Sequence, residues 1–458
     1  MDVVLHSVLP FLGILVVLVV VHELGHFITA KIAGVKVLEF GIGYPPRVFG
    51  ITRGETEYTI NLLPLGGFVR LLGEEDPTDP RSLAAQPAGT RLIVMGAGSF
   101  MNFVLAITLF TLALMIPREV NIGRAVIAQV VPGSPAQMAG LKTGDIIEEI
   151  DGRKIESVGD ASYNIRLNLG ENTEIKVRRY VDPITRRETT TETVHVTPRW
   201  APPPFVYEVK EGDDVDSVAR FTGFDREAVR QAAGITTLLV AGKEIVVQEP
   251  GSEAISYTPT EGQTVEAVAR LLHVSESAVS TAAGLPDQGK LTPGANLNFV
   301  QGATGIQIAP EFPFTEKRSL GPWAALQRGW QSTFDSLKLA RNELISWIKG
   351  GSKAPVSGPI GIAQATGEVV KQAGWKSLVD MAALLSINLA ILNILPLPML
   401  DGGRMAFVVI EIARRGRRIA PQKEALVHFV GMALMLILVV VLSYFDVARI
   451  VRGDTLFR

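Results

Sequence analysis

The chain has 458 residues, of which 47% are hydrophobic and 20% charged, and its formal net charge is −2 at pH 7. A nucleic-acid-binding protein normally carries a basic surface, so this charge balance argues against a nucleic-acid partner. The chain contains no cysteine, which excludes disulfides and thiolate ligands. Any zinc site must therefore be built from histidine and carboxylate groups.

Four segments are apolar enough to cross a bilayer, for which about 20 residues are needed. They run approximately over residues 8–33, 92–116, 378–397 and 425–444. Lysine and arginine residues gather after the first of these segments and between the last two. By the positive-inside rule we expect those two loops to be cytoplasmic, with both termini and the long middle of the chain outside. The sequence predicts a multi-pass protein of the cell inner (cytoplasmic) membrane.

The first apolar segment ends in His22-Glu23-Leu24-Gly25-His26, a His-Glu-x-x-His motif. Its two histidines are four residues apart, so on a helix they share one face and can bind one metal ion. Neutral imidazole suits Zn²⁺, and Glu23 is then expected to act as the general base. Ionisable groups at membrane depth are costly and usually mark function, which favours a metal site over an interfacial helix cap.

Residues 36–91 are rich in glycine, proline and β-forming residues. The stretches 39–49 and 58–70 alternate in polarity and contain turn residues, which predicts β-hairpins rather than helix. Hairpins of this apolar character beside a membrane helix are expected to dip into the membrane interface. Non-helical backbone at that depth is tolerated only against protein or a wet cavity.

Residues 120–200 indicate a mixed α/β domain that resembles a PDZ domain. A strand leads to a Pro-Gly turn, a short helix begins after Ser134 and closes at Gly140, and a second strand ends at Asp151-Gly152. A generic small α/β module is the alternative. The peptide groove is expected at the backbone amides of Gly123, Arg124 and Ala125. The alternative is that the domain acts only as a size filter.

Residues 205–250 and 255–302 are an internal repeat with an offset of 50 residues, in which Tyr207 matches Tyr257 and Val218-Ala-Arg220 matches Val268-Ala-Arg270. Each copy is expected to fold as strand, helix, helix, strand. Each copy resembles a LysM module, a family that binds N-acetylglucosamine-containing glycans such as peptidoglycan. Both copies have Ala-Ala where that family usually has Leu-Asn, so glycan binding and a spacer role are both open.

Residues 303–376 connect back to the membrane, and their large apolar residues recur at helical spacing. These residues are Trp323, Leu326, Trp330, Leu337, Leu344 and Trp347. The spacing predicts an amphipathic helix that lies on the bilayer surface or packs against the membrane helices.

A catalytic zinc needs a third protein ligand, and four side chains in apolar surroundings are candidates: His6, Asp380, Asp401 and His428. Asp401 lies at the inner end of its segment, as do the two histidines of the motif, so all three are expected at one depth. His428, near the inner end of the last segment, is the second candidate for the third ligand. His6 and Asp380 fall at outer ends.

The segment before Asp401 is interrupted by prolines and followed by two glycines. Broken helix at membrane depth normally lines a cavity. Asn393 lies in this stretch, and its amide is expected to hold a substrate backbone or stabilise an oxyanion. A hydrogen bond to another helix is the alternative.

Together with the motifs at 98–102 and 355–362, these features resemble the site-2 proteases, and most closely their bacterial PDZ-containing branch, which cleaves anti-sigma factors. The resemblance implies that His22, His26 and Asp401 bind Zn²⁺, that the hairpins clamp substrate as an added strand, and that the PDZ domain screens substrates. The substrate-binding positions that it implies beside Asn393 are Gly41, Gly43, Asn61, Gly66 and Gly67. Ser99 stands where proline is usual, and the repeats replace a second PDZ domain.

The expected fold is a multi-pass α-helical membrane protein with four transmembrane helices, membrane-associated β-hairpins, an extracytoplasmic PDZ domain and two LysM-like βααβ modules. The four transmembrane segments are expected at 1–35, 92–117, 377–403 and 425–446, with the β-hairpin region at 36–91 and a cytoplasmic loop at 404–424. The PDZ domain is expected at 120–200, the two repeats at 205–250 and 255–302, and the connector with the amphipathic helix at 303–376.

The expected activity is that of a zinc metalloendopeptidase that cuts a single-span membrane protein inside the lipid bilayer. The substrate is expected to be an anti-sigma factor, a similar signalling protein or a leftover signal peptide, first shortened by an upstream site-1-type protease. One alternative is a non-catalytic scaffold that tethers partners to the cell wall through its PDZ and LysM-like modules. A transporter is disfavoured because four spans without an inverted repeat do not match that architecture.

Overall fold

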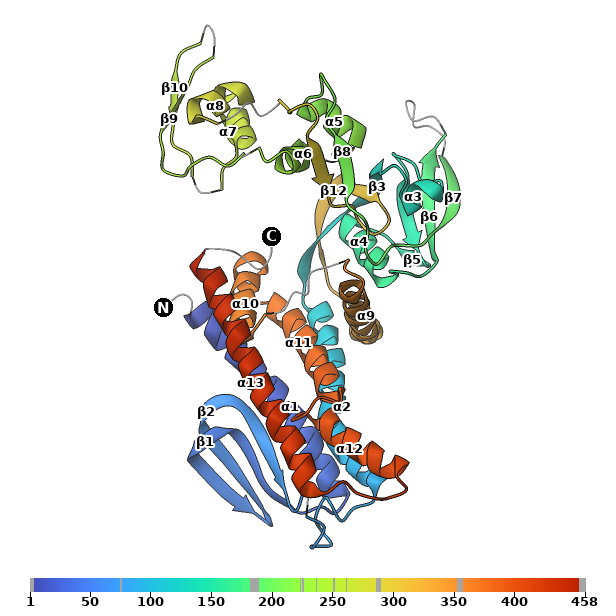
Figure 1. The fold of residues 1–458 in the computed structure, drawn as a ribbon, viewed down its shortest axis with the longest axis vertical. Helices are drawn as coiled ribbons and strands as arrows, with labels where there is room; N and C mark the ends of the chain where they lie inside the picture. Colours follow the sequence, from blue (N-terminus) through green and yellow to red (C-terminus); the bar gives the residue numbers. More distant parts are fainter. Residues whose placement is uncertain are drawn as a thin grey trace. The chain divides into compact units, whose positions relative to one another are not determined.

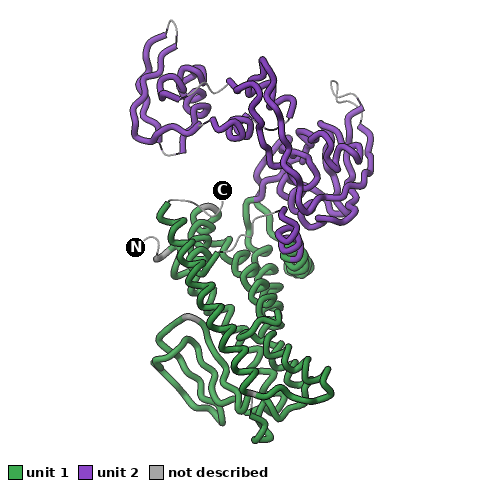
Figure 2. Tube along the Cα trace, in the orientation of Figure 1, with its two compact units in different colours: residues 1–119, 317–340, 354–458 green, residues 120–316, 341–353 purple. Residues whose placement is uncertain are grey.

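The computed structural model describes residues 4–74, 76–181, 189–222, 224, 226–235, 237–249, 252–260, 262–285, 290–351 and 357–452. The chain forms two compact units (Figure 2). Unit 1 consists of Met1–Glu119, Lys317–Ala340 and Ala354–Arg458, and unit 2 consists of Val120–Glu316 and Arg341–Lys353.

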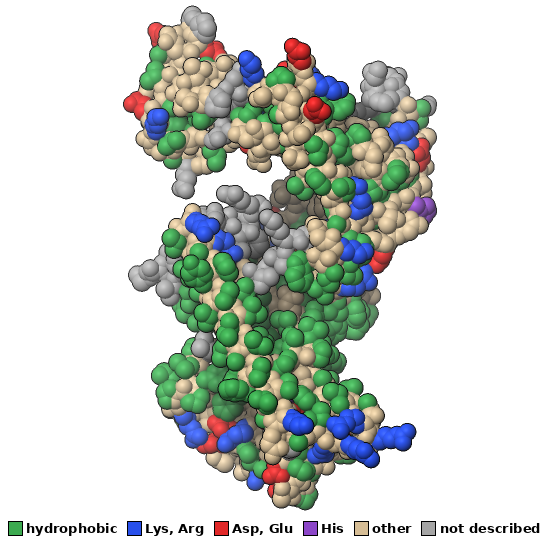
Figure 3. Space-filling model, viewed as in Figure 1, with side chains coloured by type: hydrophobic (Ala, Val, Ile, Leu, Met, Phe, Trp, Pro, Cys, Tyr) green, Lys and Arg blue, Asp and Glu red, His purple; other side chains and the backbone are tan. Residues whose placement is uncertain are grey.

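Unit 1 is built from long apolar helices. Within the described residues, four helices are long and apolar enough to cross a membrane, as predicted: α1 (Leu9–Ile32), α2 (Ala88–Met115), α11 (Ser377–Ile394) and α13 (Pro421–Val451). A short π-helical turn, η1 (Val4–Val8), leads into α1. Figure 1 shows the four apolar helices of unit 1. Hydrophobic side chains cover the visible faces of these helices, whereas basic side chains gather near the end of α12 (Figure 3). This distribution is the one expected for helices surrounded by lipid.

Helix α2 packs against both α1 and α11. At Gly25 of α1, the backbone of α2 is so close that a Cβ atom would lie 2.4 Å from the carbonyl oxygen of Ala97. Only glycine allows this approach, which is the reason small residues occur where membrane helices cross. The glycine inside the His-Glu-x-x-His motif therefore brings both histidines against α2.

The residues predicted as hairpins form one sheet from two long bent strands, β1 (Val37–Arg53) and β2 (Thr56–Leu71). Residues 39–42 lie in its middle, because they pair with 67–70 on one side and with 57–60 on the other. Residues 44–53 of β1 pair with the first part of β2, residues 56–63. The segment at 67–71 is therefore at one edge of the sheet, and β2 packs against α1.

Helix α11 ends at Ile394, and a separate helix, α12 (Asp401–Ala413), begins at Asp401. Pro396 and Pro398 lack the amide hydrogen that a continuing helix needs, so the chain turns between them. A Cβ atom on Gly402 would lie 2.1 Å from the carbonyl oxygen of Leu395, so the turn folds tightly onto the start of α12. The expectation that 404–424 is a loop is wrong for residues 421–424, which begin α13, and for residues 404–413, which belong to α12. Residues 404–413 are apolar enough to pack as a helix on α2.

Helix α9 (Pro322–Ile348) is present over the residues predicted as amphipathic helix. Within unit 1, its Trp330 and Phe334 lie with ring centroids 6.5 and 5.6 Å from that of Phe103 on α2. One face of α9 therefore packs on a membrane helix, which is one of the two alternatives given above. Helix α10 (Pro359–Ala373), also in unit 1, was not predicted, and Pro355 and Val356 of its preceding motif lie outside the described residues.

Unit 2 contains a six-stranded sheet in the order β12-β3-β4-β6-β7, with β5 paired to β4. Its strands are β3 (Arg118–Val130), β4 (Ile146–Ile150), β5 (Arg153–Lys154), β6 (Thr173–Tyr180), β7 (Thr189–Val196) and β12 (Ile306–Arg318). Two helices, α3 (Pro135–Met138) and α4 (Val158–Leu167), accompany the sheet. Ser134 caps α3 by accepting a hydrogen bond from the Gln137 amide at 3.2 Å. Strand β12 follows the repeats in the chain, so the repeats are an insertion into this α/β fold.

The repeats have the predicted order of elements. The first contains β8 (Phe205–Glu208), α5 (Val215–Thr222), α6 (Arg226–Ala232) and β9 (Ile245–Val247). The second contains β10 (Ile255–Tyr257), α7 (Val265–Leu272), α8 (Glu276–Ala283) and β11 (Asn296–Phe299). However, β8 pairs with β11 and β9 pairs with β10. This pairing differs from the expectation of two separate modules, because each strand pair joins the two repeats.

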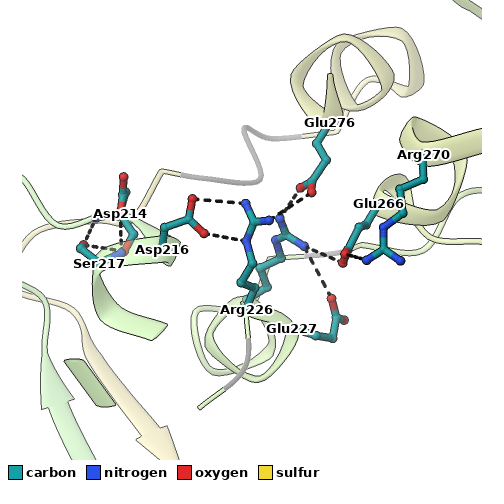
Figure 4. Close-up of polar contacts among 9 residues, drawn as sticks. Asp214, Asp216, Ser217, Arg226, Glu227, Glu266, Arg270 and Glu276 are labelled. Atoms are coloured by element: carbon teal, nitrogen blue, oxygen red, sulfur yellow. Dashed lines mark hydrogen bonds and ion pairs between the residues drawn. The ribbon is translucent and has the colours of Figure 1, made fainter. Parts of the chain in front are cut away.

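Charged side chains also join the two repeats. Arg230 of α6 is buried, and its guanidinium pairs with Glu276 and, at 3.7 Å, with Glu266 of the second repeat. Arg226 bridges Asp216 at 2.6 Å and Glu276 at 3.7 Å (Figure 4). Removing one partner of a buried ion pair is strongly destabilising, so these contacts fix one arrangement of the repeats.

The repeats are expected to be removable without unfolding the sheet of unit 2. The amide of Arg199 donates to the carbonyl of Ala303 at 2.8 Å, so the two ends of the insertion are adjacent. We expect a chain in which a short Gly-Ser linker replaces residues 203–302 to keep β3, β4 and β6 protected in amide hydrogen exchange. The losses include the burial of Val131 against the repeats, about 1–2 kcal/mol, and the hydrogen bond from Arg199 to Gln301. Loss of exchange protection throughout the sheet would contradict this.

Candidate metal centre

Two imidazoles and one carboxylate converge in unit 1. His22 Nε2 lies 3.0 Å from Asp401 Oδ2, His26 Nε2 lies 3.2 Å from the same oxygen, and the two Nε2 atoms are 3.2 Å apart. Among the described residues, these three form the group of possible metal ligands whose donor atoms all lie within 4.8 Å of one another. Helix α1 supplies the histidines one turn apart, and the first residue of α12 supplies the carboxylate.

The other candidates for the third ligand have different surroundings. The ring of His6 lies 5.7 Å from that of Trp375, and Asp380 accepts a hydrogen bond from Arg118 at 3.0 Å. His428 Nδ1 accepts the backbone amide of Met399 at 2.8 Å. Of the four candidates, Asp401 is the one whose carboxylate is within reach of both histidines.

The donor set fits Zn²⁺. Imidazole nitrogen and carboxylate oxygen are its usual non-sulfur ligands, bound at about 2.0–2.2 Å. Tetrahedral ligands at about 2.05 Å lie about 3.3 Å from one another, and the three separations here are 3.0–3.2 Å. Three protein ligands leave the fourth position open, as catalytic zinc sites require.

Helix α2 holds both histidines by the nitrogen that points away from the cluster. His26 Nδ1 is 2.7 Å from the carbonyl oxygen of Val94, and His22 Nδ1 is 3.3 Å from the side-chain amide of Asn102. Between these contacts lies Gly98, where a Cβ atom would be 2.4 Å from His26 Nε2 and 2.6 Å from His22 Nε2. Sequence reasoning gave no role to Val94 or Asn102. The sequence signal that could have revealed Asn102 is a polar amide residue four positions after Gly98 within an apolar segment.

The loop before Asp401 is held by α13, and α12 by α2. His428 accepts the Met399 amide, and a Cβ atom on Gly431 would lie 2.2 Å from Pro398. Near the other end of α12, Glu411 pairs with Arg91 at 2.6 Å. Burial disfavours the charged form of Glu411, but hydrogen bonds from Arg91 and Arg418 outweigh it and hold its pKa below the usual range. Asp401 therefore begins a helix that is fixed to two others.

Glu23 lies between the cluster and the β-sheet. Its carboxylate is close enough to interact electrostatically with the backbone amide of Val69 and with His22, His26 and Asp401. Its Cγ atom is 3.6 Å from the Cβ position of Gly67. An acid-base group thus adjoins both the cluster and the edge segment of β2.

The glycines expected to contact substrate line this part of the sheet. A Cβ atom on Gly67 would lie 2.9 Å from the carbonyl oxygen of Gly41, and one on Gly66 would lie 3.5 Å from Val19 of α1. The buried Asn61 donates to the carbonyl of Gly43 at 3.1 Å. Asn393 is buried in the last turn of α11, before the turn that leads to Asp401.

The residues expected at the PDZ groove lie on β3 in unit 2. The amide of Gly123 donates to the carbonyl of Glu156 at 2.8 Å, and Arg124 pairs with Glu311 at 3.7 Å. Ala125 is fully buried in the core of the sheet. In this structure the Gly123 amide is therefore already hydrogen-bonded within the domain.

Comparison with known proteins gives full-length matches. The pattern of peptidase family M50 matches residues 10–438. A Clostridium perfringens protein named as a candidate zinc metalloprotease is 31% identical over 433 residues, covering 94% of this chain and 95% of its own. Zinc metalloprotease RasP of Oceanobacillus iheyensis is 26% identical over 527 residues (97% and 99% coverage). The regulator of sigma-W protease RasP of Bacillus subtilis is 26% identical over 528 residues, with the same coverage.

Proposed function

This chain belongs to peptidase family M50, the site-2 protease family of zinc metalloproteases, and from that premise we propose that it cuts a peptide bond in the membrane-spanning segment of a single-span protein. The proposed substrate is an anti-sigma factor that another protease has already shortened, with leftover signal peptides as a second substrate class. The name of the Bacillus subtilis relative, a regulator of sigma-W protease, supports the first. The observation that carries the proposal is the meeting of His22, His26 and Asp401 beside Glu23.

In this proposal, the Nε2 atoms of His22 and His26 and a carboxylate oxygen of Asp401 hold Zn²⁺. When bound, zinc supplies Lewis-acid chemistry, which acidifies water and polarises a carbonyl group. Helix α2 orients both rings through the contacts of Val94 and Asn102. The anchoring of α12 keeps Asp401 at the depth of the histidines.

Glu23 acts as the proton carrier of the reaction. Its carboxylate removes a proton from the attacking water and delivers it to the nitrogen of the departing amine. The contact with the Val69 amide holds the carboxylate between the cluster and the sheet edge. A group in that position can reach both the water and the scissile bond.

The edge segment of β2 receives the substrate as an added strand. A helical substrate hides its carbonyl groups in internal hydrogen bonds, so it has to unwind before an amide can be attacked. Pairing with a sheet edge replaces those hydrogen bonds in the extended form. Gly66 and Gly67 permit close approach beside Glu23, and the Asn393 amide binds the substrate backbone from α11.

The domains of unit 2 act on substrate access. We propose that the α/β fold with sheet order β12-β3-β4-β6-β7 is a PDZ domain that screens substrates, supported by the predicted strand-turn-helix pattern around Ser134. We propose that the repeats are LysM-like. If they bind a glycan, the proposed ligand is peptidoglycan, and otherwise they act as a spacer. The ionic contacts between them support a spacer role. By the positive-inside rule, we propose that unit 2 lies outside the inner membrane and that the arginine-rich loop after α12 lies in the cytoplasm.

The experiment that tests the function uses purified full-length protein in proteoliposomes and a single-span reporter, supplied either intact or shortened on its outer side. We expect cleavage within the span of the shortened reporter only. Removal of metal with 1,10-phenanthroline should lower the rate at least about 100-fold, because the Lewis acid is lost, and added Zn²⁺ should restore it. Cleavage that survives complete metal removal, or equal cleavage of both reporters, would contradict the proposal.

A further inference from the structure

Asn102 occupies a special position in α2. It is fully buried, and its side-chain Nδ2 lies 3.3 Å from Nδ1 of His22. Its Oδ1 atom is also buried and has no hydrogen-bond partner among the described residues. The carbonyl of Asn102 accepts a hydrogen bond from Ser386 Oγ at 2.8 Å, which fixes this turn of α2 against α11. Since a side-chain amide has two orientations of nearly the same shape, either its oxygen or its nitrogen can face the His22 ring.

A half-turn of the amide about its Cβ–Cγ bond gives the oxygen a partner and places the nitrogen where the oxygen was. The rotation exchanges Oδ1 and Nδ2 with little change in shape. Oδ1 then faces His22 Nδ1 and accepts a hydrogen from it. In the opposite orientation, Nδ2 donates to Nδ1, and the ring hydrogen must be on Nε2, the nitrogen that faces Asp401 and His26. A protonated Nε2 has no lone pair for a metal ion.

His26 shows the same arrangement without ambiguity. Its Nδ1 lies 2.7 Å from the carbonyl oxygen of Val94, which can only accept, so this nitrogen carries the hydrogen. Its Nε2 therefore has a free lone pair directed at Asp401. Both histidines of the motif are thus linked to α2 through Nδ1 and directed to the cluster through Nε2.

We propose that Asn102 is a positioning residue that places the ring hydrogen of His22 on Nδ1 and so makes Nε2 the zinc ligand. The inference rests on the proposed ligand set, and it adds a side chain of α2 to the residues that support the three ligands. Contacts of this kind orient metal-bound histidines, and their loss typically costs 10–100-fold in metal affinity.

Two substitutions of similar size separate this role from simple space filling. Asn102→Asp keeps an acceptor for the Nδ1 hydrogen, whereas Asn102→Leu keeps the volume and removes the acceptor. In the full-length protein we expect Asn102→Leu to bind zinc about 10–100-fold more weakly in competition with a chelator. Asn102→Asp should stay within about threefold of wild type. The visible spectrum of the Co²⁺-substituted protein should change in the leucine variant and not in the aspartate variant.

The reverse order would overturn the proposal. If Asn102 only fills space, leucine is tolerated and a buried aspartate is not. Equal zinc affinity in both variants, or loss in both while thermal unfolding stays at the wild-type temperature, also overturns it. Thr108→Val, which removes a hydroxyl of α2 bonded to the carbonyl of Val104, is the matched control and should bind zinc as wild type does.

Failure of the ligand set would look different. His22→Ala and Asp401→Ala should each lose zinc if the proposed ligands are right. Should these two variants hold zinc as tightly as wild type, the ligand set is wrong whatever Asn102 does. Should they lose zinc while Asn102→Leu keeps it, the ligand set stands and the role of Asn102 falls.

Discussion

Replacement of Glu23 by glutamine is expected to lower kcat about a thousandfold or more while zinc stays bound. Glutamine has nearly the same shape as glutamate, and its carbonyl oxygen can still face the Val69 amide, so the local packing is preserved. It cannot take a proton from water at neutral pH. General acid-base catalysis contributes about 10²–10⁴-fold, and Glu23 serves both proton transfers in the proposed reaction.

The measurement compares kcat on the shortened reporter with zinc content in the same preparation. Glu57→Gln is a suitable control because it removes a carboxylate of the same sheet that pairs with Arg47 at 2.6 Å. We expect the control to keep kcat within about threefold, as is usual for an exposed ion pair. If Glu23→Gln cleaves at the wild-type rate, another group moves the proton. If it has also lost zinc, the residue supports the metal and the kinetic result has no bearing on catalysis.

The elements predicted from sequence are those that local pattern encodes. The four apolar helices are confirmed because about 20 apolar residues in a row have few other stable arrangements. The zinc metalloprotease family is confirmed by matches along nearly the whole chain. The long apolar runs and the family motifs can both be recognised in a single sequence, because neither depends on contacts between residues that are distant along the chain.

The errors have a common cause in long-range contacts. The repeats have the predicted strands and helices, but β8 pairs with β11 and not with β9. Either pairing satisfies the same local sequence, and the choice depends on contacts between the repeats such as Arg230 with Glu276. Likewise, α12 was taken as a loop because its apolar face is recognisable only when α2 is present to cover it.

The environment of the cluster was missed for the same reason. His22 and His26 could be recognised by their spacing, but the residues that hold their rings come from α2, about 70–80 positions further along the chain. Gly98 and Asn102 were visible only as parts of a family motif. Their physical roles, leaving space for the rings and accepting a ring hydrogen, follow from the packing of α2 against α1.

Substitution of Gly98 by alanine is expected to weaken zinc binding on the order of 100-fold or more and to abolish cleavage. The added methyl group would lie 2.4 Å from His26 Nε2, 2.5 Å from His22 Cε1 and 2.6 Å from His22 Nε2. The rings cannot move aside without breaking their contacts with Val94 and Asn102. The helices cannot separate to make room without disturbing the close packing at Gly25, where α1 contacts the backbone of Ala97.

Gly96→Ala, two residues earlier on the same helix, separates this steric effect from a general effect of alanine in α2. Among the described residues, its added Cβ atom would meet the flexible side chain of Met405 alone, at 3.5 Å. Alanine also favours helix over glycine, so Gly96→Ala should keep zinc and unfold at the same or a higher temperature. Zinc content after dialysis against a chelator distinguishes the two variants. Retention of zinc by Gly98→Ala would mean that the histidine rings have room to move. The close packing of α1 against α2 would then not be the cause of the fixed positions of the ligands.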